Sequence, residues 1–336
     1  MRTQCKFCVM DKSAEEITFD ENGRCNFCIQ AQNELESIKK LDIKDILSIK
    51  GDKYDCLIGL SGGIDSATAL VKAVEMGLRP LCFSVDNGWN NPVADENVMN
   101  LVEGLKVPFF RYVIDREKFR DLLLAFINSG VKNIEIPTDH ILMAVSYEIA
   151  NKYNIKTIIS GGNVATESIM PPSWGYNARD LVHIKDIYKR QTGKNNIELP
   201  TCSLIKWNYY KCIKRIKIIY ILDYFNYDRK KSIEELKNRF NFKDYYEKHC
   251  ESYLTWWFQN YYLFEKFSID KRKAHLSSLI NSGQITRREA LEELGKNPEY
   301  PNLGIENTIL KIKKGYHEDY KKDNYELIAK IIKWLF

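Results

Sequence analysis

The chain has 336 residues, of which 44% are hydrophobic and 28% are charged. This composition is that of a soluble globular protein with enough apolar material for one large domain or two ordinary ones. No apolar run reaches the roughly 18 residues of a membrane span, and the N-terminus lacks a signal-peptide stretch, so we expect a cytoplasmic protein. The net charge is +5, and the basic residues form no dense patch in the sequence, so a nucleic acid is not expected as a partner. A membrane is not expected as a partner either.

Nine cysteines are present, and four of them form two close pairs near the N-terminus. Cys5 and Cys8 enclose two residues, Cys25 and Cys28 enclose two more, and sixteen residues separate the pairs. Two such pairs can supply four sulfurs to one tetrahedral metal ion. The spacing predicts a structural Zn²⁺ site in a module of residues 1–30, which is too small to fold unaided. Redox-active or disulfide pairs and an iron–sulfur cluster are the alternatives.

After this module, the predicted elements alternate along the chain. Residues 31–50 have apolar side chains at helical spacing and are expected to form a charged helical connector. Short apolar runs then predict strands at 55–60, 80–85, 109–114 and 156–160. The helices expected between them cover 65–76, 93–105, 117–128 and 138–153. Such alternation is typical of the α/β class, here a doubly wound parallel sheet with helices on both faces.

The alternation stops after about residue 165. Residues 166–210 contain several prolines and glycines and are expected to form long loops with short elements. The remainder is expected to be mostly helical, with capping-box sequences that start helices at Ser232 and Thr286. We therefore expect a cysteine module (1–30), a connector (31–50), an α/β domain (51–205) and a helical region that contributes to substrate binding (206–336).

A glycine-rich loop joins the first predicted strand to the first helix of the α/β part. Its residues are Ser61, Gly62, Gly63, Ile64, Asp65 and Ser66. Glycines let the backbone turn sharply and approach a ligand, and the N–H groups of a helix N-terminus bind anions. The loop has neither the Gly-Lys-Ser/Thr ending of a Walker A motif nor the G-x-G-x-x-G of dinucleotide-binding folds. It predicts a phosphate-binding turn of another kind, with a plain strand-to-helix turn as the alternative.

The Ser-Gly-Gly-x-Asp-Ser spelling of this loop resembles the PP-loop of ATP pyrophosphatases. That group includes GMP synthetase, asparagine synthetase, NAD synthetase and tRNA-thiolating enzymes. The resemblance implies that ATP is cleaved between its α and β phosphates and that a carbonyl-type oxygen is adenylated. The pyrophosphate would be held by Ser61, Gly62, Gly63, Asp65 and Ser66, with Mg²⁺ bridging its charge and Asp65 as a catalytic candidate.

Two further turns follow predicted strands and are candidates for ATP binding. Asp86 and Asn87 come after the second strand and look like the VDNG of GMP synthetase, where the adenosine is held. A plain turn is the alternative at this position. Gly161, Gly162 and Asn163 come after the fourth strand, at the same edge of the sheet, where open α/β sheets bind ligands.

The segments beyond the loop narrow the resemblance. They are Pro137-Thr138-Asp139-His140, residues 160–168, Pro171, Pro172, Trp174, Asp180, residues 267–280 and residues 282–287. With the cysteine pairs, they resemble the N-acetyl sugar amidotransferase family of bacterial lipopolysaccharide, surface-polysaccharide and flagellin-sugar pathways, over roughly residues 3–295. The resemblance implies conversion of an acetamido group on a nucleotide-activated sugar to an acetamidino group. Substrates of that family include a UDP-linked diacetamido uronic acid and nonulosonic acids such as pseudaminic or legionaminic acid.

Several polar side chains in these segments are candidates for catalysis and substrate binding. Lys271, Arg272 and His275 are expected to bind a carboxylate or pyrophosphate of the sugar, with a solvated helix face as the alternative. Lys271 is also a catalytic candidate. His140 is expected to orient the substrate or transfer a proton, or else to cap or pack a helix. The other substrate-binding candidates are Thr138, Glu167 and Trp174, whose indole either stacks on a sugar or base or fills a loop.

The implied reaction consumes ammonia, and the chain carries no glutaminase signature. A glutaminase of the N-terminal-nucleophile kind has Cys directly after the initiator Met, whereas position 2 here is Arg. The resemblance implies separate glutaminase and ammonia-channel subunits that resemble the halves of imidazole glycerol phosphate synthase. The alternative functions are a tRNA-thiolating enzyme, which typically uses further cysteines near its active site, and a noncatalytic ATP-binding subunit. Cys202 and Cys212 are too widely spaced for a C-x2-C pair.

Overall fold

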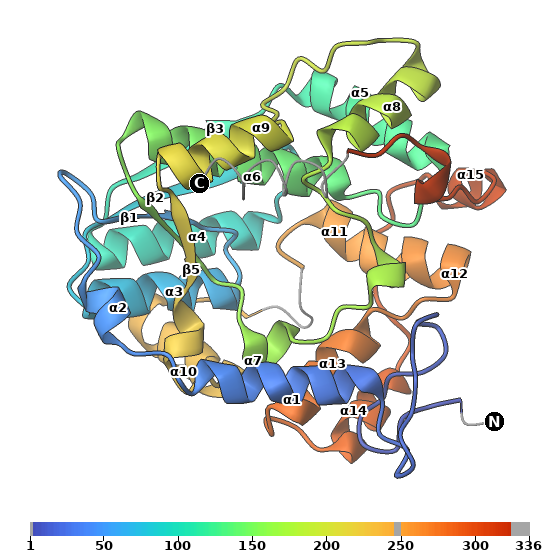
Figure 1. The fold of residues 1–336 in the computed structure, drawn as a ribbon, viewed down its shortest axis with the longest axis horizontal. Helices are drawn as coiled ribbons and strands as arrows, with labels where there is room; N and C mark the ends of the chain where they lie inside the picture. Colours follow the sequence, from blue (N-terminus) through green and yellow to red (C-terminus); the bar gives the residue numbers. More distant parts are fainter. Residues whose placement is uncertain (1–2, 245–249, 324–336) are drawn as a thin grey trace.

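The computed structural model describes residues 3–244 and 250–323, and within them five parallel strands form one sheet in the order β3-β2-β1-β4-β5. The strands are β1 (Cys56–Gly59), β2 (Pro80–Asp86), β3 (Phe109–Val113), β4 (Thr157–Ser160) and β5 (Lys217–Tyr220). Figure 1 shows the strands toward the left of the molecule and α11 to α15 toward the right, while α10 lies on the strand side, next to α3. The predicted α/β class with a doubly wound parallel sheet is confirmed.

Each face of the sheet has its own apolar core, because successive side chains of a strand point to opposite faces. In β1, Leu57 belongs to one core and Ile58 to the other. The Ile58 face is covered by α3 (Ile64–Glu75), α4 (Pro92–Leu105) and α10 (Arg229–Phe240). The Leu57 face is covered by α6 (Ile136–Lys152), with α5 (Arg116–Ser129) and α8 (Leu181–Thr192) beside it. Burial on both faces explains why the strands appear in the sequence as nearly continuous apolar runs.

The C-terminal region is mostly helical, as predicted. Helix α1 (Asn26–Ile38) begins within the predicted cysteine module and continues into the predicted connector, which also contains α2 (Lys44–Leu47); α1 lies beside α7 and α13 (Figure 1). The remaining elements are α7 (Val164–Glu167), η1 (Pro172–Trp174), α9 (Leu204–Asn208), η2 (Tyr209–Ile213), η3 (Ile221–Tyr224), α11 (Tyr253–Trp257), η4 (Phe258–Tyr262), α12 (Leu263–Phe267), α13 (Arg272–Asn281), α14 (Arg287–Leu294), α15 (Glu306–Lys311) and η5 (His317–Asp319). Within the described ranges, no helix combines the length and the apolar character needed to cross a bilayer.

The residues at which α14 and α10 begin are set by side chains that can cap a helix N-terminus. Thr286 and Glu289 form the predicted capping box at the start of α14. The helix start predicted at Ser232 is wrong, because α10 begins one turn earlier. There Asp228 is the N-cap residue, and its carboxylate accepts a hydrogen bond from the backbone N–H of Lys231 at 3.1 Å. An aspartate satisfies the free N–H groups of a first turn as well as a serine does.

Two elements depart from the expected loops and helices of residues 166–336. Helix α8 lies in the segment expected to form loops, and Asp180 caps it by accepting from the N–H of His183 at 2.9 Å. Strand β5 pairs with β4, so the sheet continues past the expected domain boundary at residue 205. Lys217 and Tyr220 are exposed on this edge strand. The short mixture of basic and apolar residues around it lacks the apolar run that marks a central strand.

Candidate active site and metal centre

The glycine-rich loop lies at the carboxyl end of β1, where the chain enters α3. The hydroxyl oxygens of Ser61 and Ser66 are 3.2 Å apart, and Ser66 Oγ also donates to the carbonyl of Gly63 at 3.1 Å. Gly62 has a φ of +83°, and a side chain there would collide with the backbone of Ala94. The N-cap residue of α3 is Gly63, which has no side chain to cap the helix. This is the arrangement of a helix start that binds phosphate.

An acidic side chain lies against this loop. A Cβ atom on Gly63 would come within 2.8 Å of the carboxyl carbon of Glu251, so the two residues are in close contact. Negative groups are stabilised at helix N-termini by the helix dipole. The loop therefore already faces an anionic group from the segment before α11, a contact that the sequence did not indicate because Glu251 stands in no recognisable motif.

The glycine turn after β4 packs directly on the loop. A Cβ atom on Gly161 would lie 2.7 Å from the carbonyl carbon of Asp65 and 2.7 Å from the backbone nitrogen of Ser66, so only glycine fits. Asn163 accepts a hydrogen bond from the N–H of Thr166 at 2.9 Å and starts α7. Because β1 and β4 are neighbours at the point where the strand order reverses, two of the predicted ATP-binding turns meet there.

The predicted adenosine turn lies at the carboxyl end of β2. Asp86 Oδ1 accepts a hydrogen bond from the N–H of Gly88 at 2.8 Å, and Asp86 forms an ion pair with Arg116 at 3.3 Å. Asn87 Oδ1 accepts from the N–H of Trp89 at 3.1 Å. Both side chains thus hold the turn itself, which keeps the plain-turn alternative open beside adenosine binding.

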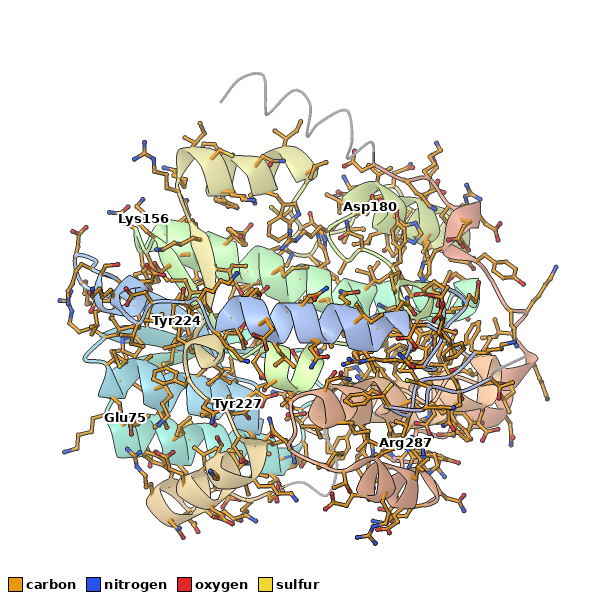
Figure 2. All side chains as sticks on the ribbon, turned by 60° about the horizontal axis from the view of Figure 1, so that its bottom comes forward. Glu75, Lys156, Asp180, Tyr224, Tyr227 and Arg287 are labelled. Atoms are coloured by element: carbon orange, nitrogen blue, oxygen red, sulfur yellow. The ribbon has the colours of Figure 1, made fainter. Side chains whose placement is uncertain are left out.

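Tyr227, between β5 and α10, links the C-terminal region to the loop (Figure 2). Its hydroxyl donates a hydrogen bond to Asp65 Oδ1, and burial next to that carboxylate raises the pKa of Tyr227 far above its usual range. Gln284 holds the backbone on both sides: it donates to the carbonyl of Tyr227 at 3.1 Å and accepts from the N–H of Arg229 at 2.9 Å. No motif in the sequence marks this tyrosine as part of the site.

Replacing Tyr227 with phenylalanine tests this link. We expect the KM for ATP to rise about 10-fold, because Asp65 loses a hydrogen bond that holds its carboxylate in place, worth about 1.5 kcal/mol. Pyrophosphate release measured against ATP concentration gives the KM. The matched control is Tyr224→Phe, since Tyr224 interacts with Asp45 and not with the loop. Equal KM values for the two variants would contradict the link.

A pocket of about 640 Å³, lined by both polar and apolar side chains, lies between α6, α7 and the C-terminal helices. It brings together four residues predicted from the sequence, Glu167, Lys271, Arg272 and His275, and four that were not predicted, Asp139, Arg229, Gln259 and Asn260. The pocket adjoins the glycine turn after β4, because a Cβ atom on Gly162 would lie 3.4 Å from Glu167 Oε2. Glu167 therefore borders both the glycine turn and the pocket.

A second carboxyl group lies at the start of α7. Asp223 Oδ1 accepts a hydrogen bond from the backbone N–H of Val164 at 2.8 Å. Burial raises the pKa of Asp223 to about 6, with the negative charge of Glu167 acting in the same direction. The short helix α7, which carries Glu167, is thus held in place by this hydrogen bond to Asp223 in η3.

Arg272 is held by the protein on several sides. Its Nη2 and Nε donate to the two carboxylate oxygens of Asp270 at 2.8 and 3.0 Å, and its Nη1 donates to the carbonyl of Lys296 at 3.0 Å. Such a bidentate pair fixes the guanidinium in one orientation. Arg272 therefore shapes the pocket wall, in addition to any contact that it makes with a substrate.

Lys271 and His275 take different positions at the same end of α13. His275 Nδ1 lies 3.1 Å from the carbonyl oxygen of Thr166, which ties α13 to α7. Lys271 Nζ lies 6.0 Å from the ring centroid of Phe258. Its positive charge also acts on Asp139, whose pKa it lowers against the larger effect of burial. The pocket thus contains a lysine charge close to a carboxyl group.

Outside the predicted ATP-binding turns, three predicted site residues are not among the described residues that line this pocket. His140 is 1% exposed; its Nδ1 lies 2.7 Å from the carbonyl of Ala178, and its Nε2 accepts from the N–H of Cys202. Burial lowers the pKa of His140, so the neutral ring fills the packing role that the sequence left open. Trp174 is buried and donates to the carbonyl of Ser13 at 2.9 Å, so its indole fills the interior. Thr138 is half-buried, and its hydroxyl is buried without a hydrogen-bond partner among the described residues.

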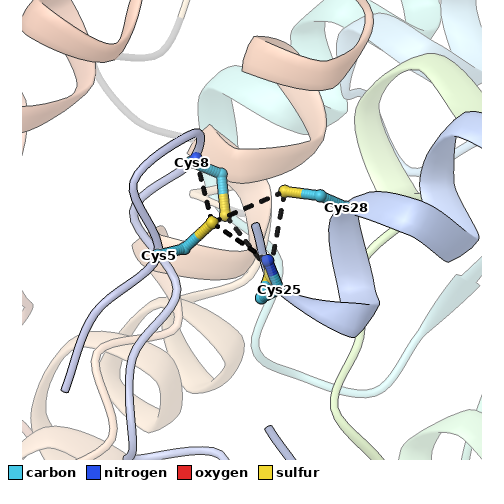
Figure 3. Close-up of side chains that lie close together, drawn as sticks. All are labelled: Cys5, Cys8, Cys25 and Cys28. Atoms are coloured by element: carbon cyan, nitrogen blue, oxygen red, sulfur yellow. Dashed lines mark hydrogen bonds between the residues drawn. The ribbon is translucent and has the colours of Figure 1, made fainter. Parts of the chain in front are cut away.

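The four N-terminal cysteines converge in one buried cluster (Figure 3). The Sγ–Sγ distances are 4.0 Å for Cys5–Cys28, 3.7 Å for Cys8–Cys25 and 3.6 Å for Cys25–Cys28. A tetrahedral ion with metal–sulfur bonds of about 2.3 Å places its sulfurs about 3.8 Å apart. The donor set therefore fits a single metal ion, whereas a cluster of several irons would need more space between the thiolates.

Surrounding donors also fit a set of thiolates. Backbone N–H groups point at Cys5 Sγ from Cys8 at 3.4 Å and from Cys25 at 3.3 Å. The side-chain amide of Asn281, on α13, donates to Cys28 Sγ at 3.4 Å. Such outer hydrogen bonds orient metal ligands and stabilise their charge. The centre is consequently attached to the helix that also carries the basic residues of the pocket.

The cysteine module is fixed to the C-terminal helices at further points, including an ion pair between Asp11 and Lys273 on α13. Ser277 Oγ on α13 accepts a hydrogen bond from the N–H of Val9 at 3.2 Å. Arg287 at the start of α14 (Figure 2) donates to the carbonyls of Cys8 and Cys5 at 3.1 and 3.3 Å. The module thus packs as part of the main fold, at the far end of α13 from the pocket.

Known proteins match parts of this chain. An uncharacterised protein of Methanocaldococcus jannaschii is 29% identical over 166 residues, which is 47% of this chain and 58% of that protein. The chain thus spans less than two thirds of the length of this relative. Residues 225–317 match the family described as LPS biosynthesis protein WbpG-like, C-terminal domain. This region contains α10 to α15 and the basic residues that line the pocket.

Solved structures also match, at low overall similarity. NMN synthetase from Francisella tularensis is 23% identical with a TM-score of 0.27, covering 41% of this chain and 54% of that one. NH3-dependent NAD synthetase from Campylobacter jejuni is 16% identical with a TM-score of 0.31, covering 63% and 93%. The U34-tRNA thiolase NcsA from Methanococcus maripaludis, solved with its 4Fe–4S cluster, is 12% identical with a TM-score of 0.35, covering 94% and 99%.

The family match and the structural description agree on one region. The pocket residues Arg229, Lys271, Arg272 and His275 all lie within residues 225–317. Residues 225–317 of this chain are accordingly similar to the C-terminal domain of WbpG-like lipopolysaccharide biosynthesis proteins.

Proposed function

We propose that this protein is an ATP-dependent amidotransferase that converts an acetamido group of a nucleotide-activated sugar to an acetamidino group. The observation that carries the proposal is the position of Glu167, which borders both the glycine turn at the ATP loop and a pocket with basic side chains. A phosphate-binding turn and a polar pocket at one edge of the sheet suit a reaction between ATP and a polar, anionic substrate. The lipopolysaccharide biosynthesis family of residues 225–317 supports a bacterial surface sugar as that substrate.

In the proposed chemistry the amide, which is a poor electrophile, reacts in two steps. The amide oxygen attacks the α-phosphorus of ATP, a new P–O bond forms, and pyrophosphate leaves. Ammonia then adds to the activated carbon, the nitrogen gives up a proton, and AMP leaves with the electrons of the C–O bond. The loop from Ser61 to Ser66 would hold the pyrophosphate through N–H groups and hydroxyls. Mg²⁺ would neutralise the phosphate charge, with the Asp65 carboxylate as an available oxygen ligand.

The pocket would hold the sugar beside this loop. Lys271 supplies a charge for a carboxylate or phosphate of the substrate, while Arg272 keeps the wall rigid through Asp270. Gln259 and Asn260, both about nine-tenths buried, offer amide groups for sugar hydroxyls. Ammonia would come from separate glutaminase and channel subunits, so the isolated chain should use ammonium and leave glutamine unchanged.

Lys271→Met tests the role of the pocket charge. We expect the KM for the sugar to rise about 10- to 100-fold, because a charge-assisted contact worth about 1.5–3 kcal/mol is lost. Methionine keeps the length of the apolar stem against Phe258, so stability should change little. Lys185→Met is the matched control, since Lys185 is an exposed lysine on α8. The assignment would be wrong if both variants kept the wild-type KM.

A substrate screen tests the proposed function as a whole. The purified chain is incubated with ATP, Mg²⁺, ammonium and a panel of UDP- and CMP-linked acetamido sugars, and AMP, pyrophosphate and the sugar product are measured. The expected result is AMP and pyrophosphate together with a sugar in which one amide oxygen is replaced by NH. Formation of ADP and phosphate would overturn the adenylation chemistry. Pyrophosphate release with tRNA and a sulfur donor would instead indicate thiolation, and binding of ATP without any turnover would indicate a noncatalytic subunit.

A further inference from the structure

We propose that Asp139, supported by Glu135, is the base that accepts the proton from the attacking ammonia. This inference rests on the proposed function and assigns one step of it to a residue that the sequence did not single out. The step is balanced: nitrogen forms a bond to the activated carbon, one N–H proton passes to the Asp139 carboxylate, and AMP leaves with the C–O electron pair. Asp139 then returns its proton to solvent.

The position of Asp139 is the first argument. It lies in the first turn of α6 and lines the pocket together with Lys271 and Glu167. Helix α6 runs back along the sheet into β4, so its first turn lies at the carboxyl edge of the strands, where the ATP loop lies. A carboxylate at this edge is near the place where an activated sugar would react. Asp139 is accessible to solvent and is one of the residues that line the pocket.

The surroundings of Asp139 suit a proton acceptor that works near neutral pH. Burial raises the pKa of Asp139 to about 6, and Lys271 opposes this rise. Glu135, one turn earlier and 7% exposed, accepts a hydrogen bond from Thr255 Oγ1 at 2.8 Å. Burial and the Asp139 charge raise the pKa of Glu135 to about 7. Two neighbouring carboxyl groups with raised pKa values can hold a proton between them.

The opposite wall of the pocket adds polar groups from an unusual helix segment. Gln259 and Asn260 lie in η4, a π-helical turn that interrupts the helices α11 and α12. Such turns are frequent at functional sites because they redirect side chains. The other charged groups that line the pocket are Glu167, Arg229, Arg272, His275 and Glu293. The positive charge of Lys271 acts on both Asp139 and Glu135 and lowers their pKa values against the larger effect of burial.

Asp139→Asn separates the two half-reactions. Sugar-dependent exchange of pyrophosphate into ATP, measured without ammonium, reports adenylation alone. We expect this exchange to stay within about 3-fold of wild type, whereas amidine formation with ammonium falls by about 100-fold or more, the usual contribution of a general base. Glu117→Gln, an exposed first-turn carboxylate on α5, is the control and should leave both rates unchanged.

The pH profile gives a second measurement that a merely structural role would not move. In the wild type, the rate of amidine formation should fall as pH drops through about 6, where Asp139 becomes protonated. Lys271→Met, measured at saturating sugar, should shift this limb to higher pH, because the positive charge that lowers the pKa of Asp139 is removed. Equal losses of exchange and amidine formation in Asp139→Asn, or an unshifted limb in Lys271→Met, would overturn the inference. Wild-type protein that shows neither activity would refute the proposed function instead.

Discussion

Gly161→Ala is expected to lower ATP turnover by about 100-fold or more. The added methyl group would lie 2.7 Å from both the carbonyl carbon of Asp65 and the backbone nitrogen of Ser66, which are parts of the ATP loop itself. Backbone atoms cannot move aside as a flexible side chain can, so either the β4 turn or the start of α3 must shift. A displacement of about 1 Å in a phosphate-binding site is enough for a loss of this size. Pyrophosphate release at saturating sugar and varied ATP is the measurement.

A second glycine provides the control for this substitution. Gly175 follows η1 with a φ of −149°, and a Cβ atom there would meet only the side-chain amide of Asn133 at 3.5 Å, an ordinary contact. Gly175→Ala should therefore retain activity. Circular dichroism and thermal unfolding of both variants show whether Gly161→Ala remains folded. A folded Gly161→Ala variant with wild-type turnover would show that the packing of the two turns is not needed for catalysis.

Cys25→Ser is expected to abolish metal binding and to unfold the N-terminal module. Metal of this kind contributes on the order of 10 kcal/mol to small cysteine modules, and three remaining sulfurs cannot close the tetrahedron. Elemental analysis of the wild type should find one zinc per chain. Protease treatment of the variant should cleave within the first thirty residues while the sheet stays intact. A chelator added to the wild type should reproduce this pattern.

The control for the metal prediction is Cys212→Ser. Cys212 is half-exposed and lies in η2, outside the cluster, so its loss should leave the metal content unchanged. Iron with visible charge-transfer absorption in the wild type would contradict zinc and favour an iron–sulfur centre. Wild-type protein that contains no metal and shows a disulfide by mass spectrometry would support the redox alternative instead.

The sequence predicted those parts of the fold that depend on local pattern. The strands β1 to β4 were found because both of their faces are buried, which makes their apolar runs nearly continuous. Strand β5 was missed because it is an edge strand with exposed Lys217 and Tyr220. Helix α8 was missed since the prolines and glycines around it suggested loops. In both cases tertiary contacts decide the structure, and a single sequence does not contain them in readable form.

The residues of the candidate site also differ in whether a local motif or only a tertiary contact marks them. Residues within a motif, such as Gly161 and Lys271, could be proposed from the sequence because their chemistry and spacing are local. Asp139 and Tyr227 were missed, since a carboxylate becomes a candidate base only through its surroundings, and a tyrosine becomes part of the loop only through its contact with Asp65. His140 shows the converse: a histidine in a recognisable motif is occupied by hydrogen bonds inside the fold.

Helix α13 connects the pocket to the cysteine module. At one end Lys271 and His275 face the pocket, and at the other Ser277 and Asn281 are bound to the cysteine module. A ten-residue helix is a stiff rod, so a displacement at either end is transmitted to the other. Damage to the module, including oxidation of its thiolates, should therefore appear in kinetics as weaker sugar binding. A high KM for the sugar alone does not show that a variant is altered in the pocket, so the metal content of the variant must be measured as well.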